Sequence, residues 1–402
     1  MNKLLYPCII VPAFKRTASL RLLLKSLSQA NYPSLISVPL IISIDKSTNL
    51  EVRKIAEEFH WLNGKKEIIN HKENLGLKKH ILYCGNLTKK YNSVIILEDD
   101  LYVSPDFYHY SVKAINHFYN DSKVAGIALY HSNYSEIRNM NFYPLYEGFQ
   151  NYFHQLPCSW GQVWTMGQWT HFVENYQSAI DQIIPFKAST WPDDSSWKKD
   201  FFKYMVAYDK YFVYPHYSLT TNFGAPGQHY NTSTSLLQTP LNIGRNTDFS
   251  FIDYQHSNSI YDAWGEILPR ILKKLNPVLN KYDFACDLSG NKNLAEVNNE
   301  YIISIRECNH SIIGYENALI PPELNIINSI NGTFFNLGLK VNFNPVPAWE
   351  KIELLSEHYT KINISGIRKG IELKYTSNLA YRLCVLSLKP FRYLKKLIFK
   401  VF

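Results

Sequence analysis

The chain has 402 residues, of which 46% are hydrophobic and 15% are aromatic. This composition supplies a sizeable buried core and excludes a disordered protein, and the length favours two domains or one large domain with an appendage. The six cysteines form no CxxC pair and no Cys/His group at zinc spacing. They therefore favour reduced thiols in a cytoplasmic protein over a disulfide framework or a zinc site.

The net charge of +8 is concentrated at the C-terminus. Residues 366–402 hold nine of the 42 Lys and Arg residues and one of the 34 acidic ones, so the rest of the chain is balanced. The end, LKPFRYLKKLIFKVF, alternates apolar with basic side chains, which suits an amphipathic helix in the interface of an anionic membrane. The alternative is a helix docked on the protein itself. Nucleic-acid binding is not expected, because the basic charge is confined to one end and no nucleic-acid module is visible.

The N-terminal stretch MNKLLYPCIIVPAF has the lysine and apolar run of a signal peptide. Pro7 and Pro12 interrupt the run and no small-residue cleavage site follows. We therefore expect a first β-strand here rather than a signal peptide. No stretch reaches about 18 uninterrupted apolar residues, so no membrane-spanning helix is expected.

Strand and helix patterns alternate through the first 130 residues. Short apolar runs predict strands at about 8–12, 39–45, 66–71, 93–99 and 124–130. Helical spacing, as for Leu20, Leu23, Leu24 and Leu27, predicts helices at 17–27, 52–59 and 77–87. A further helix is expected with Ser104 as its cap and Pro105 as its first residue. Repeated βα units of this kind predict an α/β fold with a mainly parallel sheet and helices on both faces.

The remainder of the chain is less regular. Residues 130–238 are rich in Trp and Tyr, which suits either sugar binding in loops or an aromatic core. A helical stretch is expected at 254–275, followed by a small β-containing unit at 276–365. The predicted domains are thus 1–275, with a nucleotide-binding half 1–130 and an acceptor half 131–275, then the unit 276–365 and the tail 366–402.

Polar groups follow four successive predicted strands: Arg16, Asp45, the HKENLGLKKH segment with His80, and the triplet Glu98, Asp99 and Asp100. In parallel α/β sheets, ligands bind outside the carboxyl ends of the strands. Crowded carboxylates suit Mg²⁺ or Mn²⁺, which take further ligands from substrate phosphates. A solvated acidic loop at a helix start is the alternative for the triplet alone. Taken together, the four strand ends predict a nucleoside-diphosphate site.

Several motifs strengthen this prediction through a family resemblance. The segment VIILEDDLYVSPDF resembles the metal-binding DxD-type motif of GT-A glycosyltransferases, especially the E-D-D form of N-acetylglucosaminyltransferase I-type enzymes. PAFKR, SIDKS and LKKHILYC are similar to nucleotide-binding motifs of that group, WPDDSSW to its W-D-D-W catalytic loop, and TNFGAPG to its phenylalanine-glycine loop. ENLGL and SWGQVW resemble bacterial family 2-like enzymes that build surface polysaccharides. The resemblance covers about residues 5–235.

The resemblance implies a role for each matching residue. Asp100 would ligate Mn²⁺ or Mg²⁺, with His229 as a possible second ligand of the metal or diphosphate. The nucleotide sugar would be bound by Pro12, Arg16, Asp45, His80, Glu98 and Asp99, and the acceptor or sugar by Trp160, Gly161 and Trp191. Asp194, or otherwise Asp193, would be the general base. Pro192 and the Ser195-Ser196 pair depart from the W-D-D-W pattern and leave the identity of the base open.

The implied function is the transfer of a sugar from a nucleoside-diphosphate sugar, with a UDP-sugar preferred, to a hydroxyl of a lipid-linked glycan in bacterial surface polysaccharide synthesis. Displacement with inversion is expected, although the fold does not fix the stereochemistry. The expected location is cytoplasmic and peripheral, at the inner face of the plasma membrane through residues 366–402. Two alternatives are a nucleotidyltransferase acting on sugar phosphates, for which PAFKRTAS lacks the expected glycines, and a non-catalytic glycan-assembly subunit with the same fold.

Overall fold

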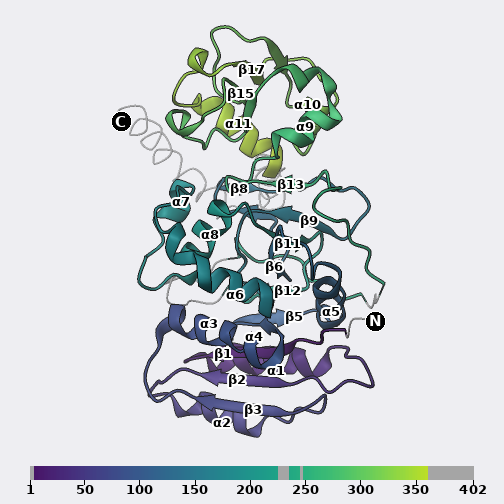
Figure 1. The fold of residues 1–402 in the computed structure, drawn as a ribbon, viewed down its shortest axis with the longest axis vertical. Helices are drawn as coiled ribbons and strands as arrows, with labels where there is room; N and C mark the ends of the chain where they lie inside the picture. The colour runs from purple at the N-terminus through teal and green to yellow at the C-terminus, as the bar shows by residue number, and fades with distance from the viewer. Residues whose placement is uncertain (1–3, 225–234, 245–247, 361–402) are drawn as a thin grey trace, which may run out of the picture. The chain divides into compact units, whose positions relative to one another are not determined.

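The computed structural model describes residues 4–224, 235–244 and 248–360 (Figure 1). The chain divides into two compact units, Met1–Glu353 and Leu354–Phe402. The predicted boundary at residues 275 and 276 stays a prediction, and the predicted tail 366–402 lies outside the described residues.

A nine-stranded sheet forms the centre of the first unit. Its order is β13-β9-β11-β6-β10-β4-β1-β2-β3, which Figure 1 shows with β3 near the bottom and β13 just above β9. The strands are β1 Cys8–Ala13, β2 Leu40–Ile44, β3 Lys66–Asn70, β4 Ser93–Ile96, β6 Val124–Ala128, β9 Asn151–His154, β10 Gln162–Thr165, β11 Tyr211–Pro215 and β13 Ile260–Tyr261. Strands β3, β2, β1 and β4 are parallel. Strand β10 runs antiparallel between β4 and β6. The predicted α/β fold with a mainly parallel sheet is confirmed.

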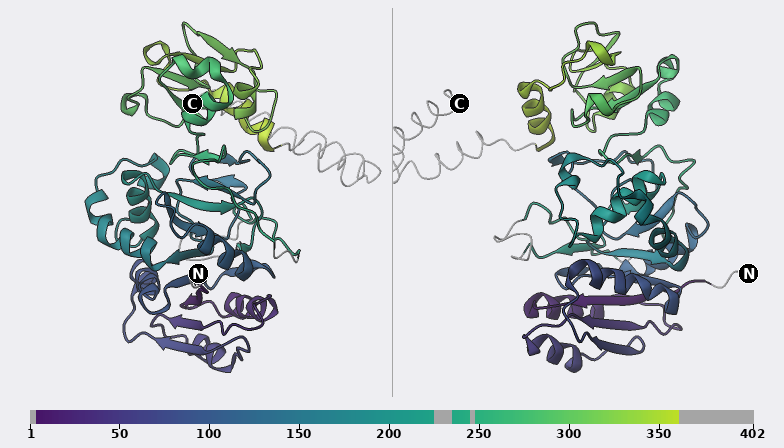
Figure 2. Two further views of the ribbon diagram at one scale, coloured as in Figure 1. Left: turned by 45° about the vertical axis from the view of Figure 1, so that its right-hand side comes forward. Right: turned by 60° about the vertical axis from the view of Figure 1, so that its left-hand side comes forward.

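The helices follow from apolar side chains at helical spacing. On α1 (Thr17–Gln29) the four leucines Leu20, Leu23, Leu24 and Leu27 are buried, and they cover one face of the helix. The other helices are α2 Leu50–Glu58, α3 Gly76–Asn86, α4 Thr88–Tyr91, α5 Phe107–His117, α6 Met166–Asn175, α7 Phe186–Ser189, α8 Trp197–Ala207, α9 Pro269–Leu275, α10 Glu323–Ile327 and α11 Trp349–Thr360. Figure 2 shows, in two further views, that the helices of the N-terminal part of the chain lie alongside its strands.

Two predicted helices differ from the structure. Helix α5 begins at Phe107 with Asp106 as its N-cap residue, rather than at Pro105. The residues before it form a turn, in which the Phe107 N–H donates to the Ser104 carbonyl at 3.3 Å. The prediction of helix at 254–275 was wrong except for α9, because β13 and a turn at Gly265, which has φ +75°, occupy the first part.

Smaller sheets complete the first unit. Strand β5 (Leu101–Val103) pairs with β12 (Thr220–Asn222), and β7 (Tyr134–Ser135) forms a hairpin with β8 (Met140–Asn141). A four-stranded sheet, β14-β15-β17-β16, is built from β14 Phe284–Asp287, β15 Tyr301–Ser304, β16 Ile313–Tyr315 and β17 Phe335–Leu339. The predicted β-rich character of this part of the chain agrees with these strands.

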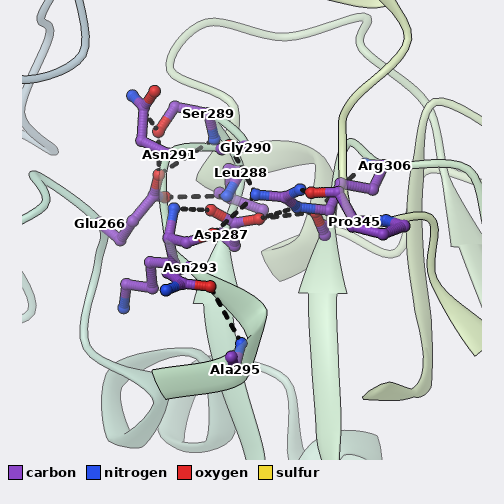
Figure 3. A network of polar contacts seen from close by, with 12 residues as sticks. Glu266, Asp287, Leu288, Ser289, Gly290, Asn291, Asn293, Ala295, Arg306 and Pro345 are labelled. Carbon is purple, nitrogen blue, oxygen red and sulfur yellow. Dashed lines mark hydrogen bonds and ion pairs between the residues drawn. The ribbon is translucent and has the colours of Figure 1, made fainter. Parts of the chain in front are cut away.

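A buried polar network holds the start of the four-stranded sheet (Figure 3). Glu266 accepts hydrogen bonds from the backbone N–H groups of Leu288 and Ser289, both at 3.0 Å. Asp287, at the end of β14, accepts from Arg306 Nε at 2.8 Å. Because Asp287 is 0% and Arg306 3% exposed, each charge depends on the other for compensation.

The aromatic region 130–238 contributes strongly to the core. Trp164 and Trp169 are completely buried, and the rings of Trp164 and Phe201 stack with centroids 5.6 Å apart. All five described cysteines are free thiols, and four of them are buried. Within residues 4–224, 235–244 and 248–360, no helix is both long and apolar enough to cross a membrane.

Candidate active site

The acidic triplet lies at the edge of the sheet where β1 and β4 end. The two strands are parallel neighbours, with Cys8 opposite Val94, so their carboxyl ends meet. The Phe14 N–H donates to Asp99 Oδ2 at 3.1 Å. One nitrogen of Arg16, Nη1, lies 3.3 Å from Asp99 Oδ1 and also forms an ion pair with Asp100. The structure thus brings Arg16 to two of the three predicted acids.

The triplet carries more negative charge than Arg16 compensates. Burial, together with the charges of Asp100 and Asp99, raises the pKa of Glu98 to about 8. Burial also raises the pKa of Asp99 to about 6, against the opposing effect of Arg16. Arg16 and the more distant Lys198 act in the other direction on Glu98. An additional cation at this edge would relieve the remaining repulsion.

The carboxylates at this edge suit a divalent metal that has other ligands as well. Among the described residues, no three His, Cys, Asp or Glu side chains gather around one point. Mg²⁺ is nonetheless usually held by one or two carboxylates, with waters and substrate phosphates as its other ligands. Glu98 and Asp100 both line the cavity described below and offer the hard oxygen donors required. The residues therefore fit a metal that is completed by a bound diphosphate.

Asp45 lies at the end of β2, where it organises the backbone of the next helix. Its Oδ1 accepts from the Leu75 N–H at 2.8 Å, and its Oδ2 from the Gly76 N–H at 3.0 Å. Oδ1 also accepts from the Lys46 N–H at 2.8 Å. Asp45 thereby supplies the cap at the N-terminus of α3 that Leu75 itself does not provide. Its predicted contact with a nucleoside stays a prediction.

His80, on α3, is buried against the same sheet edge. Its Nε2 lies 2.8 Å from Ser43 Oγ, and the same hydroxyl lies 2.9 Å from His71 Nε2. Burial lowers the pKa of His80 to about 4, so the imidazole is neutral at pH 7. Pro12 is buried in β1, where it lies opposite Ser43 in the strand register. These residues form one contiguous group beside the end of β2.

A cavity of about 430 Å³ opens next to the triplet. Its lining combines Arg16, Glu98 and Asp100 with Trp160 and Trp191 from the second half of the chain. The other lining residues are Leu77, Glu136, Ser159, Lys187, Pro192, Ser196, Trp197, Lys198, Asn222, Gly224 and Leu237. The lining of the cavity therefore combines carboxylates and a guanidinium group from the strand ends with aromatic rings from later in the chain.

Asn222 and Gly224 line the cavity, whereas Gly161, predicted to bind the acceptor or sugar, lies next to the lining residue Trp160 and is not itself in the lining. Gly161 has φ +91°, and a Cβ placed there would come within 2.9 Å of Thr220 Cγ2. The Thr220 hydroxyl donates to the Trp160 carbonyl at 2.6 Å. Phe223 donates its N–H to the Asp100 carbonyl at 3.2 Å, which places the first residues of the predicted TNFGAPG motif beside the triplet. His229, predicted as a metal or diphosphate ligand, lies outside the described residues.

The two aspartates predicted as catalytic base lie in the loop before α8. The Asp193 side chain is 80% exposed and its Oδ1 lies 2.8 Å from Lys199 Nζ. Asp194 is exposed and accepts a hydrogen bond from Ser195 Oγ at 3.1 Å. Neither side chain lines the cavity, although Trp191, Pro192 and Ser196 of the same loop do.

Glu136 and Lys198 are two of the lining residues that were not predicted from the sequence. Lys198 Nζ, on α8, lies 3.5 Å from Glu136 Oε1, in the turn between β7 and β8. Lys198 directly follows the WPDDSSW motif, and this position in the sequence could have indicated that it belongs to the site. Glu136 lies in the segment NYSEIRN, where no motif or periodic pattern marks it.

The cavity and its carboxylates lie at the carboxyl ends of parallel strands, which is where ligands bind in open α/β sheets. Residues 8–168 match the model of the family described as "Glycosyl transferase family 2". This match confirms the predicted resemblance to glycosyltransferases, and the matched residues include Arg16, Asp45, His80 and the triplet. No curated protein matches the chain.

Several solved structures of glycosyltransferases are similar to part of this chain. The mannosyltransferase PcManGT from Pyrobaculum calidifontis, in complex with GDP-Man and Mn²⁺, is 12% identical over 53% of this chain and 55% of its own, with a TM-score of 0.35. TarS of S. aureus is 12% identical over 53% of this chain and 36% of its own, with a TM-score of 0.33. GalNAc-T7 with UDP, GalNAc and Mn²⁺ is 13% identical over 58% of this chain and 47% of its own, with a TM-score of 0.39. The chain thus spans about half or less of each of these structures.

Proposed function

We propose that the protein transfers a sugar from a nucleoside-diphosphate sugar, with a UDP-sugar preferred, to a hydroxyl group of a lipid-linked glycan. The observation that carries the proposal is the cavity, because one space joins the acidic triplet and Arg16 to two tryptophans. Aromatic faces suit the apolar C–H surface of a sugar ring, and carboxylates with a metal suit a diphosphate. The proposed setting is bacterial surface polysaccharide synthesis at the inner face of the plasma membrane.

In the proposed reaction, Asp100 would hold Mn²⁺ or Mg²⁺, with support from Glu98 and Asp99. Such a cation, when bound, would supply positive charge for the departing diphosphate. Arg16 places a second positive charge beside the same carboxylates, and Trp160 and Trp191 orient the sugar and restrict water. A carboxylate on the far side of the sugar accepts the proton of the acceptor hydroxyl, which gives displacement with inversion.

Nucleotide binding tests the proposal. Thermal melting of the protein would be measured with UDP, GDP, CDP and dTDP, each with and without Mn²⁺. We expect one nucleotide to stabilise the protein only with the metal, by about 2.7 kcal/mol at a concentration about 100 times its Kd. Asp100→Asn should lose the metal-dependent part, whereas the exposed Asp181→Asn should keep it. Equal melting with and without Mn²⁺ for all four nucleotides would refute the proposed site.

The membrane part of the proposal needs a separate test. Binding to liposomes of phosphatidylglycerol and phosphatidylethanolamine would be compared for the full chain and for a chain that ends at Ser365. Because residues 366–402 contain nine basic side chains, the full chain should sediment together with the anionic liposomes, and added salt should reduce this binding. Equal sedimentation of both chains would remove the proposed role of this segment.

A further inference from the structure

An ion pair lies in the aromatic wall of the cavity. Lys198 Nζ is 3.5 Å from Glu136 Oε1, and the two side chains are 13% and 18% exposed. The same ammonium group lies 5.2 Å from the ring centroid of Trp160 and 4.8 Å from that of Trp191. Both tryptophans line the cavity together with the pair. Glu136 is therefore a partly exposed carboxylate at the surface proposed to hold the sugar.

Rigid elements hold this pair in place. Glu136 follows β7, and the next turn is fixed by the Arg138 N–H, which donates to Ser135 Oγ at 3.1 Å. The Arg138 guanidinium is buried and donates to the Gly265 carbonyl at 3.2 Å. Lys198 lies in the first turn of α8, whose N-terminus is capped by Ser196. Lys198 is thus held by a helix, and Glu136 by the turn between β7 and β8.

The pair lines the same cavity as two carboxylates of the acidic triplet. The lining carboxylates among the described residues are Glu98, Asp100 and Glu136. The first two lie at the end of β4 beside Arg16, where the diphosphate is proposed to bind. Lys198 is near enough to Glu98 for its charge to lower the pKa of that carboxyl. Among the described residues, Glu136 is thus the lining carboxylate that lies outside the triplet, whereas Asp193 and Asp194 do not line the cavity.

We propose that Glu136 is the group that removes the proton from the acceptor hydroxyl, and that Lys198 is a positioning residue whose ammonium group, beside Trp160 and Trp191, holds the Glu136 carboxylate in the cavity lining. This inference rests on the proposed glycosyl transfer and identifies its base. A Glu136 oxygen takes the hydroxyl proton while the acceptor oxygen bonds to the anomeric carbon. The bond from that carbon to the phosphate oxygen breaks, and its electron pair leaves with the nucleoside diphosphate. Glu136 then releases the proton to water.

Donor hydrolysis, with water as the acceptor, tests this role without knowledge of the natural acceptor. Release of nucleoside diphosphate would be measured with Mn²⁺ from UDP-glucose, UDP-galactose, UDP-N-acetylglucosamine, UDP-N-acetylgalactosamine and GDP-mannose. Glu136→Gln should lower the rate by about 10²- to 10⁴-fold, as the loss of a general base does. Metal-dependent nucleotide binding should persist in this variant. Glu174→Gln, which removes an exposed carboxylate of α6 outside the cavity, is the matched control and should react as the wild type does.

Two further variants separate a base from a structural ion pair. In Glu136→Ala, sodium formate should restore part of the rate, because a small carboxylate can enter the space left by the side chain. Lys198→Met should slow the reaction less than Glu136→Gln, since the base is kept but less well positioned. A structural ion pair would give similar losses for the two partners and no recovery with formate.

The outcomes distinguish the base from the function as a whole. A Glu136→Gln enzyme that binds nucleotide and reacts as fast as the wild type would overturn the role of Glu136. That role would also be overturned if Asp194→Asn showed the large loss instead, or if formate failed to restore Glu136→Ala. A wild-type protein without metal-dependent nucleotide binding would overturn the proposed function itself.

Discussion

Removing Arg306 should strongly destabilise the protein, because it leaves the Asp287 carboxylate buried without its partner. Asp287 is 0% exposed and lies 2.8 Å from Arg306 Nε. The guanidinium also donates to the carbonyls of Gly290 and Lys292, both at 2.7 Å, and to that of Pro345. Breaking a buried pair by removing one partner costs about 3–5 kcal/mol. We therefore expect Arg306→Met to lower the free energy of unfolding by about 3–5 kcal/mol.

Urea denaturation followed by circular dichroism would measure this change. Arg53→Met is the matched control, because Arg53 pairs with Glu57 on the surface of α2 with both side chains at least half exposed. An exposed pair of this kind contributes little, so the control should unfold almost as the wild type does. The double variant Asp287→Asn/Arg306→Met should recover part of the loss, because it removes the uncompensated charge.

The pH dependence gives a second test of the same reasoning. Burial, followed by the charge of Glu266, raises the pKa of Asp287, and Arg306 opposes this rise. Without Arg306 the pKa in the folded state should rise further above its value in the unfolded state. The folded variant then binds more protons than the unfolded chain, so its stability should fall as the pH increases through that interval. A stability loss below about 1 kcal/mol, or a loss independent of pH, would refute the assigned energetic role of the pair.

Three other substitutions test further parts of the structure. Gly161→Ala should lower the free energy of unfolding by about 1–3 kcal/mol, because its φ of +91° and the approach to Thr220 leave no room for a methyl group; a melting temperature equal to that of the wild type would contradict this. Asp45→Ala should lower the free energy of unfolding, measured by urea denaturation, by about 0.5–2 kcal/mol, because two N–H groups at the start of α3 lose their acceptor. If the amide hydrogens at the start of α3 exchanged at the same rate in the variant as in the wild type, the capping role would be disproved. Trp164→Ala should cost about 3–5 kcal/mol as a core truncation, whereas Trp191→Ala at the cavity wall should melt closer to the wild type. The reverse order of the two melting temperatures would show that their assignment to core and cavity is mistaken.

The sequence predicted best what depends on local patterns. Apolar runs marked β1 to β4 within one or two residues at their N-terminal ends, and the leucines of α1 marked its buried face. The helix predicted at 254–275 failed because apolar content alone does not distinguish helix from short strand and turn. Gly265 and Pro269 were the local signals that interrupt it.

The part of the site at the ends of β1 and β4 could be predicted from the order of the strands, whereas the meeting of Glu136 with Lys198 could not. Arg16 and the triplet follow β1 and β4, so parallel pairing alone brings them together. Glu136 and Lys198 are 62 positions apart and meet only because a hairpin and α8 pack at the same cavity. A contact between residues so far apart in the sequence produces no periodic pattern in either segment, so neither segment predicts it.

The lining of the cavity comes from separate stretches of sequence, and this has a consequence for how specificity can change. Arg16, Glu98 and Asp100 come from the first 100 residues, whereas Glu136 comes from the turn between β7 and β8. Substitutions in this hairpin leave the pairing of β1 with β4 untouched. Under the proposed function, exchange of the hairpin between related enzymes is therefore a route to a new acceptor in which the groups proposed for the metal and the diphosphate stay the same.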